Sequence, residues 1–327
     1  MSRNKAQNSL HEFDDFEREI LLPHKFSQNG PALAIGDADN DGLDDFYIGG
    51  AKNQASVLLL QKEDGRFNSV QQPIWNMDKI HEDVAADFFD ADGDGDLDLY
   101  VVSGGNEEEE QNEYYRDRFY KNTGKGVFVR VMEAIPENHI SGSCVTAADF
   151  DNDGALDIVH VNGWGEVRDS NYRQQSMRFF HNTNPEALVF EERANEIGLD
   201  DRGQGRGIAC FDADRDGFLD IVINNNDDNN IVLYRNQTDN GNHYLTVKLN
   251  GTGNNQLGVG ARITLASEKG TQIRELGGTN NYVSHNPLEA HFGLGSATTA
   301  DIIVRWPDGS ETMTSNVNVD QLVTISQ

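Results

Sequence analysis

Residues 149–157 read Asp149-Phe-Asp-Asn-Asp-Gly-Ala-Leu-Asp157, and the same nine-residue pattern occurs four times in the chain. The other copies begin at Asp37, Asp90 and Asp212, at nearly regular intervals. Each has aspartate at positions 1, 3, 5 and 9 and glycine at position 6. Carboxylates at alternate positions of a tight turn converge on one point, and the glycine permits the turn, which is typical of a calcium loop. A pattern repeated at this spacing indicates a repeat architecture.

Each loop is predicted to bind Ca²⁺ through the side chains at positions 1, 3, 5 and 9 and the carbonyl at position 7, which belongs to Leu43, Asp96, Ala155 or Phe218. An acidic turn without metal would leave four carboxylates repelling one another within nine residues, four times over. We therefore predict four calcium sites. Their ligands are Asp37, Asp39, Asp41, Leu43 and Asp45; Asp90, Asp92, Asp94, Asp96 and Asp98; Asp149, Asp151, Asp153, Ala155 and Asp157; and Asp212, Asp214, Asp216, Phe218 and Asp220.

The segments around the loops exclude an EF-hand. That motif requires a bidentate glutamate at position 12 and flanking helices. Position 12 is instead Ile48, Val101, His160 or Ile223, within short β-branched runs that are typical of strands. The repeated unit is therefore a strand, an acidic loop and a second strand.

This unit resembles the FG-GAP/VCBS repeat, which builds integrin-like β-propellers with calcium in the loop between the first two strands of a blade. The C-terminal part is similar to the ASPIC/UnbV domain, as shown by His243–Leu249, Gly258–Arg262, His291–Gly295 and Arg305–Gly309. That domain follows such repeats in secreted, acidic, cartilage-type proteins and in bacterial relatives. Alternating apolar residues and a Pro-Asp-Gly turn predict a small β-sandwich here.

Third and fourth strands can be placed in the repeats. The third strands are Val57–Leu60, Arg118–Tyr120, Met177–Phe180 and Ile231–Tyr234, and the fourth begin at Phe67, Phe128 and Phe190. The last repeat lacks a fourth strand, whereas Phe13, Phe16 and Ile20 have the matching spacing near the N-terminus. The fold class is thus all-β: a four-bladed calcium-binding β-propeller closed by the N-terminal strand, plus a C-terminal β-sandwich-like domain. The alternative is a shortened or incomplete ring. Domains are predicted at residues 1–12 (tail), 13–240 (propeller) and 241–327 (ASPIC/UnbV-like domain).

A possible ligand face lies opposite the calcium loops. In an up-and-down blade, the loops between strands two and three share a face with those between blades, and loops on a rigid scaffold often bind ligands. The alternative interpretation is that these loops are ordinary solvated turns that bind no ligand. The candidate residues are His81, Tyr114, Tyr115, Arg116, His139, Trp164, Arg168, Tyr172, Arg173 and Arg206.

Composition limits the partners. The net charge of −29 argues against a nucleic-acid surface and against docking on anionic lipid. No segment is apolar enough for membrane insertion. Met1–Leu10 lacks the apolar region of a secretory signal, so either the protein is cytoplasmic or a leader has been removed. Cys144 and Cys210 are expected to face opposite sides of their sheets and to remain unpaired.

The sequence contains none of the common catalytic or phosphate-binding motifs, and we assign no catalytic residue. The favoured function is a calcium-stabilised extracellular or cell-surface module that binds a protein or carbohydrate, as in adhesion. The resemblance leaves two alternatives open: a polysaccharide-processing enzyme of the lyase or dehydratase type, and a lectin, both using the face opposite the calcium sites.

Overall fold

The computed structural model describes Asp14, Phe16 and residues 30–108, 112–163, 175–225, 231–277 and 284–327. Strands dominate these residues, and the helical elements are short: α2 (Pro73–Met77) and the 3₁₀ turns η2 (Glu113–Tyr115) and η4 (Pro185–Ala187). Within the described part of the chain, no helix has the length and apolar character needed to span a bilayer.

The repeats form four consecutive antiparallel sheets, each with its strands in chain order. Their strands are β1 (Leu33–Gly36), β2 (Asp45–Ile48), β3 (Val57–Gln61) and β4 (Phe67–Val70); β5 (Asp83–Phe89), β6 (Asp98–Ser103), β7 (Arg118–Asn122) and β8 (Phe128–Arg130); β9 (Gly142–Ala148), β10 (Asp157–Asn162), β11 (Arg178–Asn184) and β12 (Val189–Glu192); and β13 (Gly205–Phe211), β14 (Asp220–Asn225) and β15 (Ile231–Tyr234). The predicted third and fourth strands are confirmed, because each falls on one of these elements.

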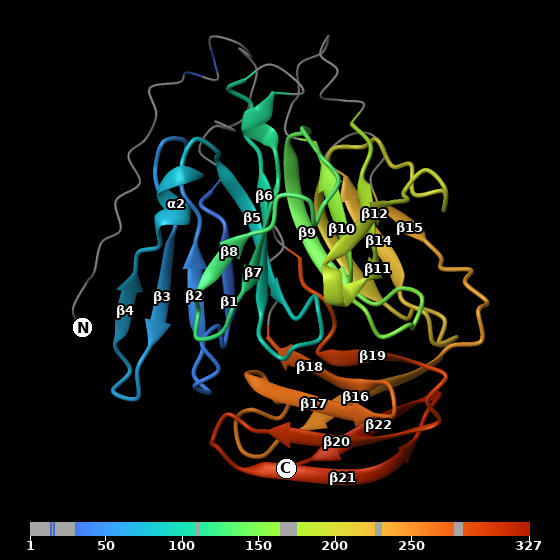
Figure 1. The fold of residues 1–327 in the computed structure, drawn as a ribbon. Helices are drawn as coiled ribbons and strands as arrows, with labels where there is room; N and C mark the ends of the chain where they lie inside the picture. Colours follow the sequence, from blue (N-terminus) through green and yellow to red (C-terminus); the bar gives the residue numbers. More distant parts are fainter. Residues whose placement is uncertain are drawn as a thin grey trace.

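The sheets stand side by side (Figure 1). Their first strands β1, β5, β9 and β13 pack against one another in succession. Every residue of β6 and β10 is buried, because these strands are covered by neighbouring sheets on both faces. This explains why residues 99–102 of β6 are apolar without the alternation of a strand with one solvated face.

The predicted closure of the ring is not confirmed. Among the described residues the last sheet has three strands, and β15 is its edge, with Ile231 69% and Leu233 48% exposed. Of the three residues assigned to a closing strand, Phe13 and Ile20 lie outside the described residues. Phe16 is helical and 39% exposed, so the prediction of a strand is wrong at that residue.

A cavity of about 750 Å³ lies between the inner strands and the C-terminal domain. Its wall includes Leu33 and Ile35 of β1, Phe88 of β5 and Cys210 of β13. The exposed fractions of Leu33 and Ile35 are 39% and 53%, because this face of β1 is not covered by another sheet of the described chain.

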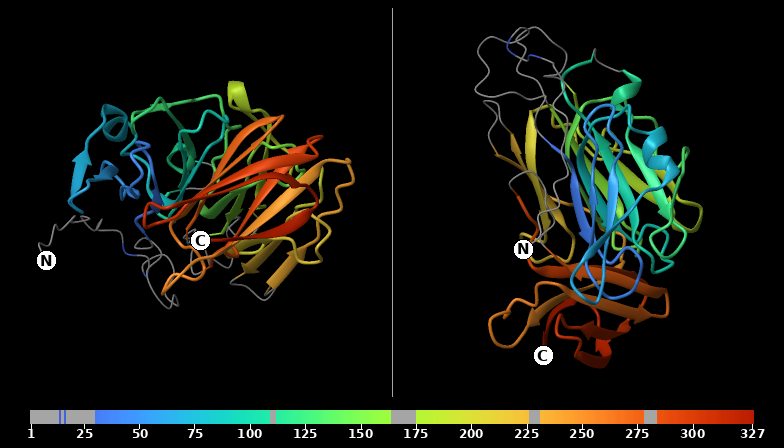
Figure 2. Two further views of the ribbon diagram at one scale, coloured as in Figure 1. Left: turned by 90° about the horizontal axis from the view of Figure 1, so that it is seen from below. Right: turned by 90° about the vertical axis from the view of Figure 1, so that its left-hand side faces the viewer.

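The C-terminal part folds as two packed sheets, as predicted for a β-sandwich. One has the order β19-β16-β22 and the other β18-β17-β20-β21. Their strands are β16 (His243–Asn250), β17 (Ala261–Ser267), β18 (Gly270–Leu276), β19 (Glu289–Gly295), β20 (Thr299–Arg305), β21 (Glu311–Asn318) and β22 (Gln321–Ser326). Leu245, Phe292, Ile302 and Trp306 belong to the buried core between them. This domain lies across one end of the four repeat sheets (Figures 1 and 2).

Both cysteines are free and buried, as expected. They nevertheless belong to the same apolar core, between the sheets of β9–β12 and β13–β15. Side chains on opposite faces of equivalent sheets meet when the sheets stack, so the predicted orientations bring Cys144 and Cys210 into one core instead of separating them.

Candidate metal centre

Each acidic loop brings three carboxylates together. The groups are Asp37, Asp39 and Asp41; Asp90, Asp92 and Asp94; Asp149, Asp151 and Asp153; and Asp212, Asp214 and Asp216. In each, one oxygen of every residue lies within 4.8 Å of the others. Positions 1, 3 and 5 therefore converge in all four loops, and the donors are all hard oxygen atoms of the kind that Ca²⁺ prefers.

Backbone hydrogen bonds hold the loops in the same conformation. The N–H of the glycine at position 6 donates to Oδ2 of the aspartate at position 1, at 2.9, 3.1, 2.8 and 3.0 Å in chain order. The N–H at position 7 donates to Oδ1 at position 5 in every loop. The glycines have φ between 90° and 101°, which explains why glycine stands there.

Position 4 is left-handed in every loop, with φ between 59° and 73°. Asparagine or glycine, which tolerate this conformation, occupies three of the four positions. The exception is Arg215, whose Nη1 lies 3.2 Å from Oε2 of Glu289 in the C-terminal domain. Its side chain is 60% exposed. Arg215 therefore pairs with a carboxylate outside its own loop.

The aspartates at position 9 do not belong to the converging groups. Oδ2 of Asp45 accepts the N–H of Ala38 at 3.0 Å, and its Oδ1 accepts the N–H of Gln61 at 2.7 Å. Asp98, Asp157 and Asp220 make the equivalent pair of bonds in their own sheets. Position 9 thus ties the loop to the third strand. Burial raises the pKa of Asp45 to about 7 and that of Asp98 to about 8.

Two of the loops contain a buried carboxylate oxygen without a partner. Asp37 is 2% exposed and Asp149 is 1% exposed, and Oδ1 of each has no hydrogen-bond partner among the described residues. Leaving an anionic oxygen buried and unpaired costs free energy, so these atoms are well suited to a cation. Burial, followed by the repulsion of Asp157 and Asp153, raises the pKa of Asp149 well above its usual value.

A basic side chain accompanies the loops of the second, third and fourth sheets. Lys121 and His181 lie in the third strand of their sheets, and Arg235 directly follows the third strand of its own. Lys121 contacts Asp92, His181 Nδ1 lies 2.9 Å from Asp157 Oδ1, and Arg235 Nη1 lies 2.9 Å from Asp214 Oδ2. The equivalent residue of the first sheet is Leu60.

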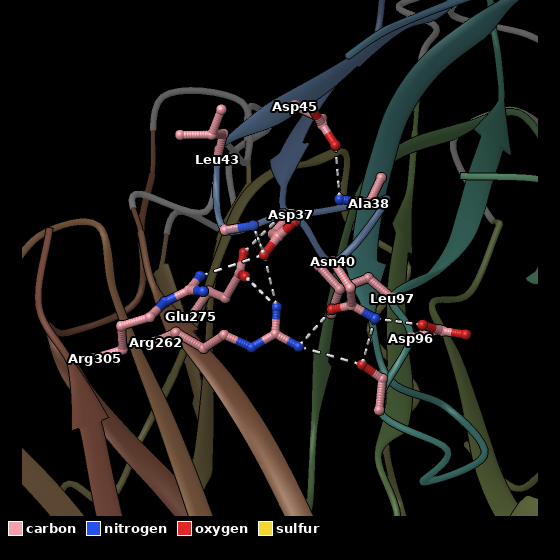
Figure 3. A network of polar contacts seen from close by, with 12 residues as sticks. Asp37, Ala38, Asn40, Leu43, Asp45, Asp96, Leu97, Arg262, Glu275 and Arg305 are labelled. Carbon is pink, nitrogen blue, oxygen red and sulfur yellow. Dashed lines mark hydrogen bonds and ion pairs between the residues drawn. The ribbon is translucent and has the colours of Figure 1, made fainter. Parts of the chain in front are cut away.

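The first loop receives its cations from the C-terminal domain (Figure 3). Arg262 Nη1 lies 3.1 Å and Arg305 Nη2 lies 3.3 Å from Oδ2 of Asp37. Arg262 also donates to Oδ1 of Asn40 at 2.8 Å, and Glu275 accepts the N–H of Asp37 at 3.3 Å. Both guanidinium groups contact Oδ2 and leave Oδ1 of Asp37 open.

The C-terminal domain also contacts the third loop. His291 Nε2 lies 2.7 Å from Oδ1 of Asn152, and Gly295 donates its N–H to the Asn152 carbonyl at 2.8 Å. Gly293 approaches the Asp149 carboxylate so closely that a Cβ atom would overlap it. The sequence did not predict that this domain covers the acidic loops, because none of the motifs in the domain indicates which surface it contacts.

Three asparagines that sequence reasoning missed connect neighbouring loops. Nδ2 of Asn122 donates to the carbonyl of Ala38, at position 2 of the preceding loop, at 2.8 Å, and to that of Leu97 in its own loop at 3.1 Å. Asn182 and Asn236 make the same pair of bonds. A recurring aromatic–basic–asparagine triplet at the end of the third strand was the available signal: Tyr120-Lys121-Asn122, Phe180-His181-Asn182 and Tyr234-Arg235-Asn236.

The predicted ligand face is only partly assembled. His81 is 5% exposed and its Nδ1 lies 3.0 Å from the carbonyl of Tyr114. Lys52 lies 4.9 Å from the centre of the Tyr114 ring, and the Tyr115 hydroxyl bonds to the backbone of Glu108. These groups form one cluster. Burial, followed by the nearby Arg118 charge, lowers the pKa of His81 to about 4, which favours neutral imidazole.

The remaining candidate residues lie away from this cluster or outside the described residues. Arg116 pairs with Glu137 at 3.3 Å, Arg206 is 6% exposed and donates to the Gly163 carbonyl, and His139 is partly buried. Trp164, Arg168, Tyr172 and Arg173 fall outside the described residues. The structure therefore brings the aspartates at positions 1, 3 and 5 of each loop together. Ligation by positions 7 and 9 and the ligand face remain predictions.

Two family models match the chain. Residues 16–101 and 102–160 match the FG-GAP-like repeat, and residues 251–327 match ASPIC and UnbV.

Similar curated proteins share one name. Cartilage acidic protein 1 of Xenopus tropicalis is 26% identical over 287 residues, which cover 86% of this chain and 42% of the relative. The mouse and human proteins of that name are each 29% identical over 168 residues, covering 50% of this chain and 25% of the relative. The chain thus spans less than half the length of these relatives.

Among solved structures, the Vibrio cholerae biofilm matrix protein Bap1 is 9% identical with a TM-score of 0.27, over 89% of this chain and 57% of that chain. This likeness is too slight to bear on fold or function. The family matches agree with the order of repeat sheets and terminal sandwich. The chain is made of FG-GAP-like repeats followed by an ASPIC and UnbV domain, the type to which cartilage acidic protein 1 belongs.

Proposed function

We propose that this chain is a calcium-stabilised, non-catalytic binding module that works outside the cell or at its surface. In this proposal the four repeat sheets are blades of a propeller and their acidic loops hold Ca²⁺. The observation that carries it is the pair of buried Oδ1 atoms of Asp37 and Asp149, which lack partners inside converging groups of carboxylates.

The donor set favours a hard divalent cation. The converging side chains are all aspartates, without the sulfur or imidazole ligands that zinc and copper prefer. Loops that supply several carboxylates suit Ca²⁺ better than Mg²⁺, which keeps most of its waters. Calcium-binding extracellular modules have dissociation constants of about 10⁻⁴ to 10⁻³ M. That range supports a compartment rich in calcium.

A protein or carbohydrate partner is proposed on the face opposite the acidic loops. The C-terminal domain already covers the loop face through Arg262, Arg305 and His291, so the opposite face is left for a partner. The names of the relatives support an extracellular setting. Neutral, buried His81, bonded to a backbone carbonyl, fits a structural role better than that of a general acid, which favours binding over catalysis.

Calorimetric melting with and without calcium tests the metal part of this proposal. A ligand that binds only the folded state stabilises it, so chelation should lower Tm by many degrees. Asp149→Asn removes a ligand and also a repelling charge, so this variant should gain less from calcium and melt slightly higher in EDTA. The control is Asp64→Asn, which removes one exposed charge from a turn outside the loops. Identical melts of the unmodified chain in calcium and in EDTA would exclude a structural calcium.

The partner is tested by screening immobilised glycans and extracellular matrix proteins with the purified chain, in calcium and in EDTA. Calcium-dependent retention of one ligand class supports the binding module. Turnover of a polysaccharide would instead support the enzymatic alternative, and saturable binding to a single sugar would support a lectin.

A further inference from the structure

The four loops differ in how their carboxylates are satisfied, and the difference divides them into two pairs. In the first and third loops, position 1 is an aspartate at most 2% exposed, with Oδ1 unpaired. In the second loop, the N–H of Gly93 donates to Oδ1 of Asp90 at 2.9 Å. In the fourth, the N–H of Asp216 donates to Oδ1 of Asp212 at 3.1 Å. A cation therefore gains an unsatisfied oxygen only in the first pair.

The second and fourth loops also contain a cation of the protein itself. The Lys121 ammonium contacts Oδ2 of Asp92 and lies 3.4 Å from Oδ2 of Asp94, so it bridges two of the three converging carboxylates. Arg235 Nη1 lies 2.9 Å from Oδ2 of Asp214. These groups occupy carboxylate oxygens at position 3, and in the second loop also at position 5, that a bound Ca²⁺ needs as ligands.

The corresponding residues of the other two sheets leave positions 3 and 5 more open. Leu60 of the first sheet is uncharged. His181 of the third sheet directs Nδ1 to Asp157 at position 9, while its Nε2 is 4.0 Å from Asp151. The arginines near the first loop contact Oδ2 of Asp37, the oxygen that Gly42 also binds, and not Oδ1.

We propose that the loops are two classes of cation site: the first and third bind Ca²⁺ tightly, whereas the second and fourth bind it weakly. In the weak pair, Oδ1 at position 1 is already hydrogen-bonded, and Lys121 or Arg235 pairs with the carboxylate at position 3. This inference rests on the proposed calcium binding. In this proposal Lys121 and Arg235 are not ligands themselves, but they set the calcium affinity of their loops.

Titration of the full chain with CaCl₂ by isothermal calorimetry tests the proposal. We expect two ions to bind first and two more at a calcium concentration at least about tenfold higher. Lys121→Gln combined with Arg235→Gln should tighten the second step about tenfold or more and leave the first unchanged. The matched control combines Arg66→Gln with Lys62→Gln, which removes two exposed cations from a turn outside the loops.

Single loop variants assign the steps. Asp149→Asn should remove one ion from the tight step, and Asp212→Asn one ion from the weak step. Four equivalent sites in the unmodified chain would overturn the two classes while leaving the proposed calcium binding intact. The same holds if the Lys121 and Arg235 variant behaves like its control. An absence of any calcium uptake would instead refute the proposed function itself.

Discussion

The neighbouring carboxyl groups of Glu82 and Glu107 show how burial and a second carboxyl group raise the pKa of a single residue in this very acidic chain. Glu82 is 8% exposed. Burial, followed by the repulsion of Glu107 and a hydrogen bond between the two carboxyl groups, raises the pKa of Glu82 from 4.5 to about 9. The nearby Lys52 charge opposes this shift. At neutral pH the folded protein therefore keeps a proton that the unfolded chain releases.

That shift predicts how Glu82→Gln changes stability with pH. A carboxyl whose pKa is raised by folding contributes stability at low pH, and the contribution declines as pH rises from about 4.5 toward about 9. Glutamine cannot ionise, so the variant should melt several degrees higher than the unmodified protein at pH 8.5 and at about the same temperature at pH 4.5. Calorimetry at both pH values, with exposed Glu63→Gln as the control, checks this. An equal shift at both values would contradict the assignment.

At the scale of the elements, the loops are held to one another through the third strands. Asn182 is 1% exposed, and its Nδ2 donates to the carbonyl of Ala91 in the preceding sheet at 2.9 Å and to that of Leu156 at 3.4 Å. One side chain thus bridges two acidic loops, so we expect the conformation of one loop to depend on that of its neighbour.

We predict that Asn182→Ala destabilises the protein by about 1 to 3 kcal/mol, because two buried carbonyls lose a donor. Urea unfolding monitored by circular dichroism measures the change. Asn68→Ala, on the exposed strand β4, is the control and should change stability by less than about 0.5 kcal/mol. A similarly small change for Asn182→Ala would show that the bridge adds no stability.

The acidic loops and most strands could be predicted from sequence because their signals are local. Asp at alternate positions and glycine at position 6 lie within nine residues, and the structure reproduces the same hydrogen bonds in each loop. The bridging role of Asn182 is a contact between sheets, and its partner Ala91 is 91 residues away in the chain. Such a partner is specified by packing, which a strand pattern does not reveal.

At the scale of the whole molecule, sequence did not predict where the C-terminal domain lies. Its strands and core follow from alternation, but Arg262 meets Asp37 across 225 residues of chain. The predicted ring closure likewise depended on a distant pairing, between the N-terminal segment and β15, which the described residues do not show. The interface formed by Arg262, Arg305 and His291 instead makes the acidic loops the platform of the C-terminal domain.

This arrangement predicts that Arg262→Gln uncouples the C-terminal domain from the repeats. The Arg262 side chain is 13% exposed and lies 3.1 Å from Asp37 and 3.4 Å from Glu275, so its loss leaves two largely buried carboxylates without that cation. Removing one partner of a buried ion pair costs about 3 kcal/mol or more when burial is complete, and somewhat less here. Calorimetry should resolve two melting transitions in place of one, and protease should cut faster between β15 and β16.

Lys248→Gln is the control, because that half-exposed lysine lies 3.9 Å from Glu289 within its own domain. If Arg262→Gln melts in a single transition with an unchanged cleavage rate, this ion pair does not hold the domains together, and the contacts of His291 and Gly293 with the third loop are sufficient to do so.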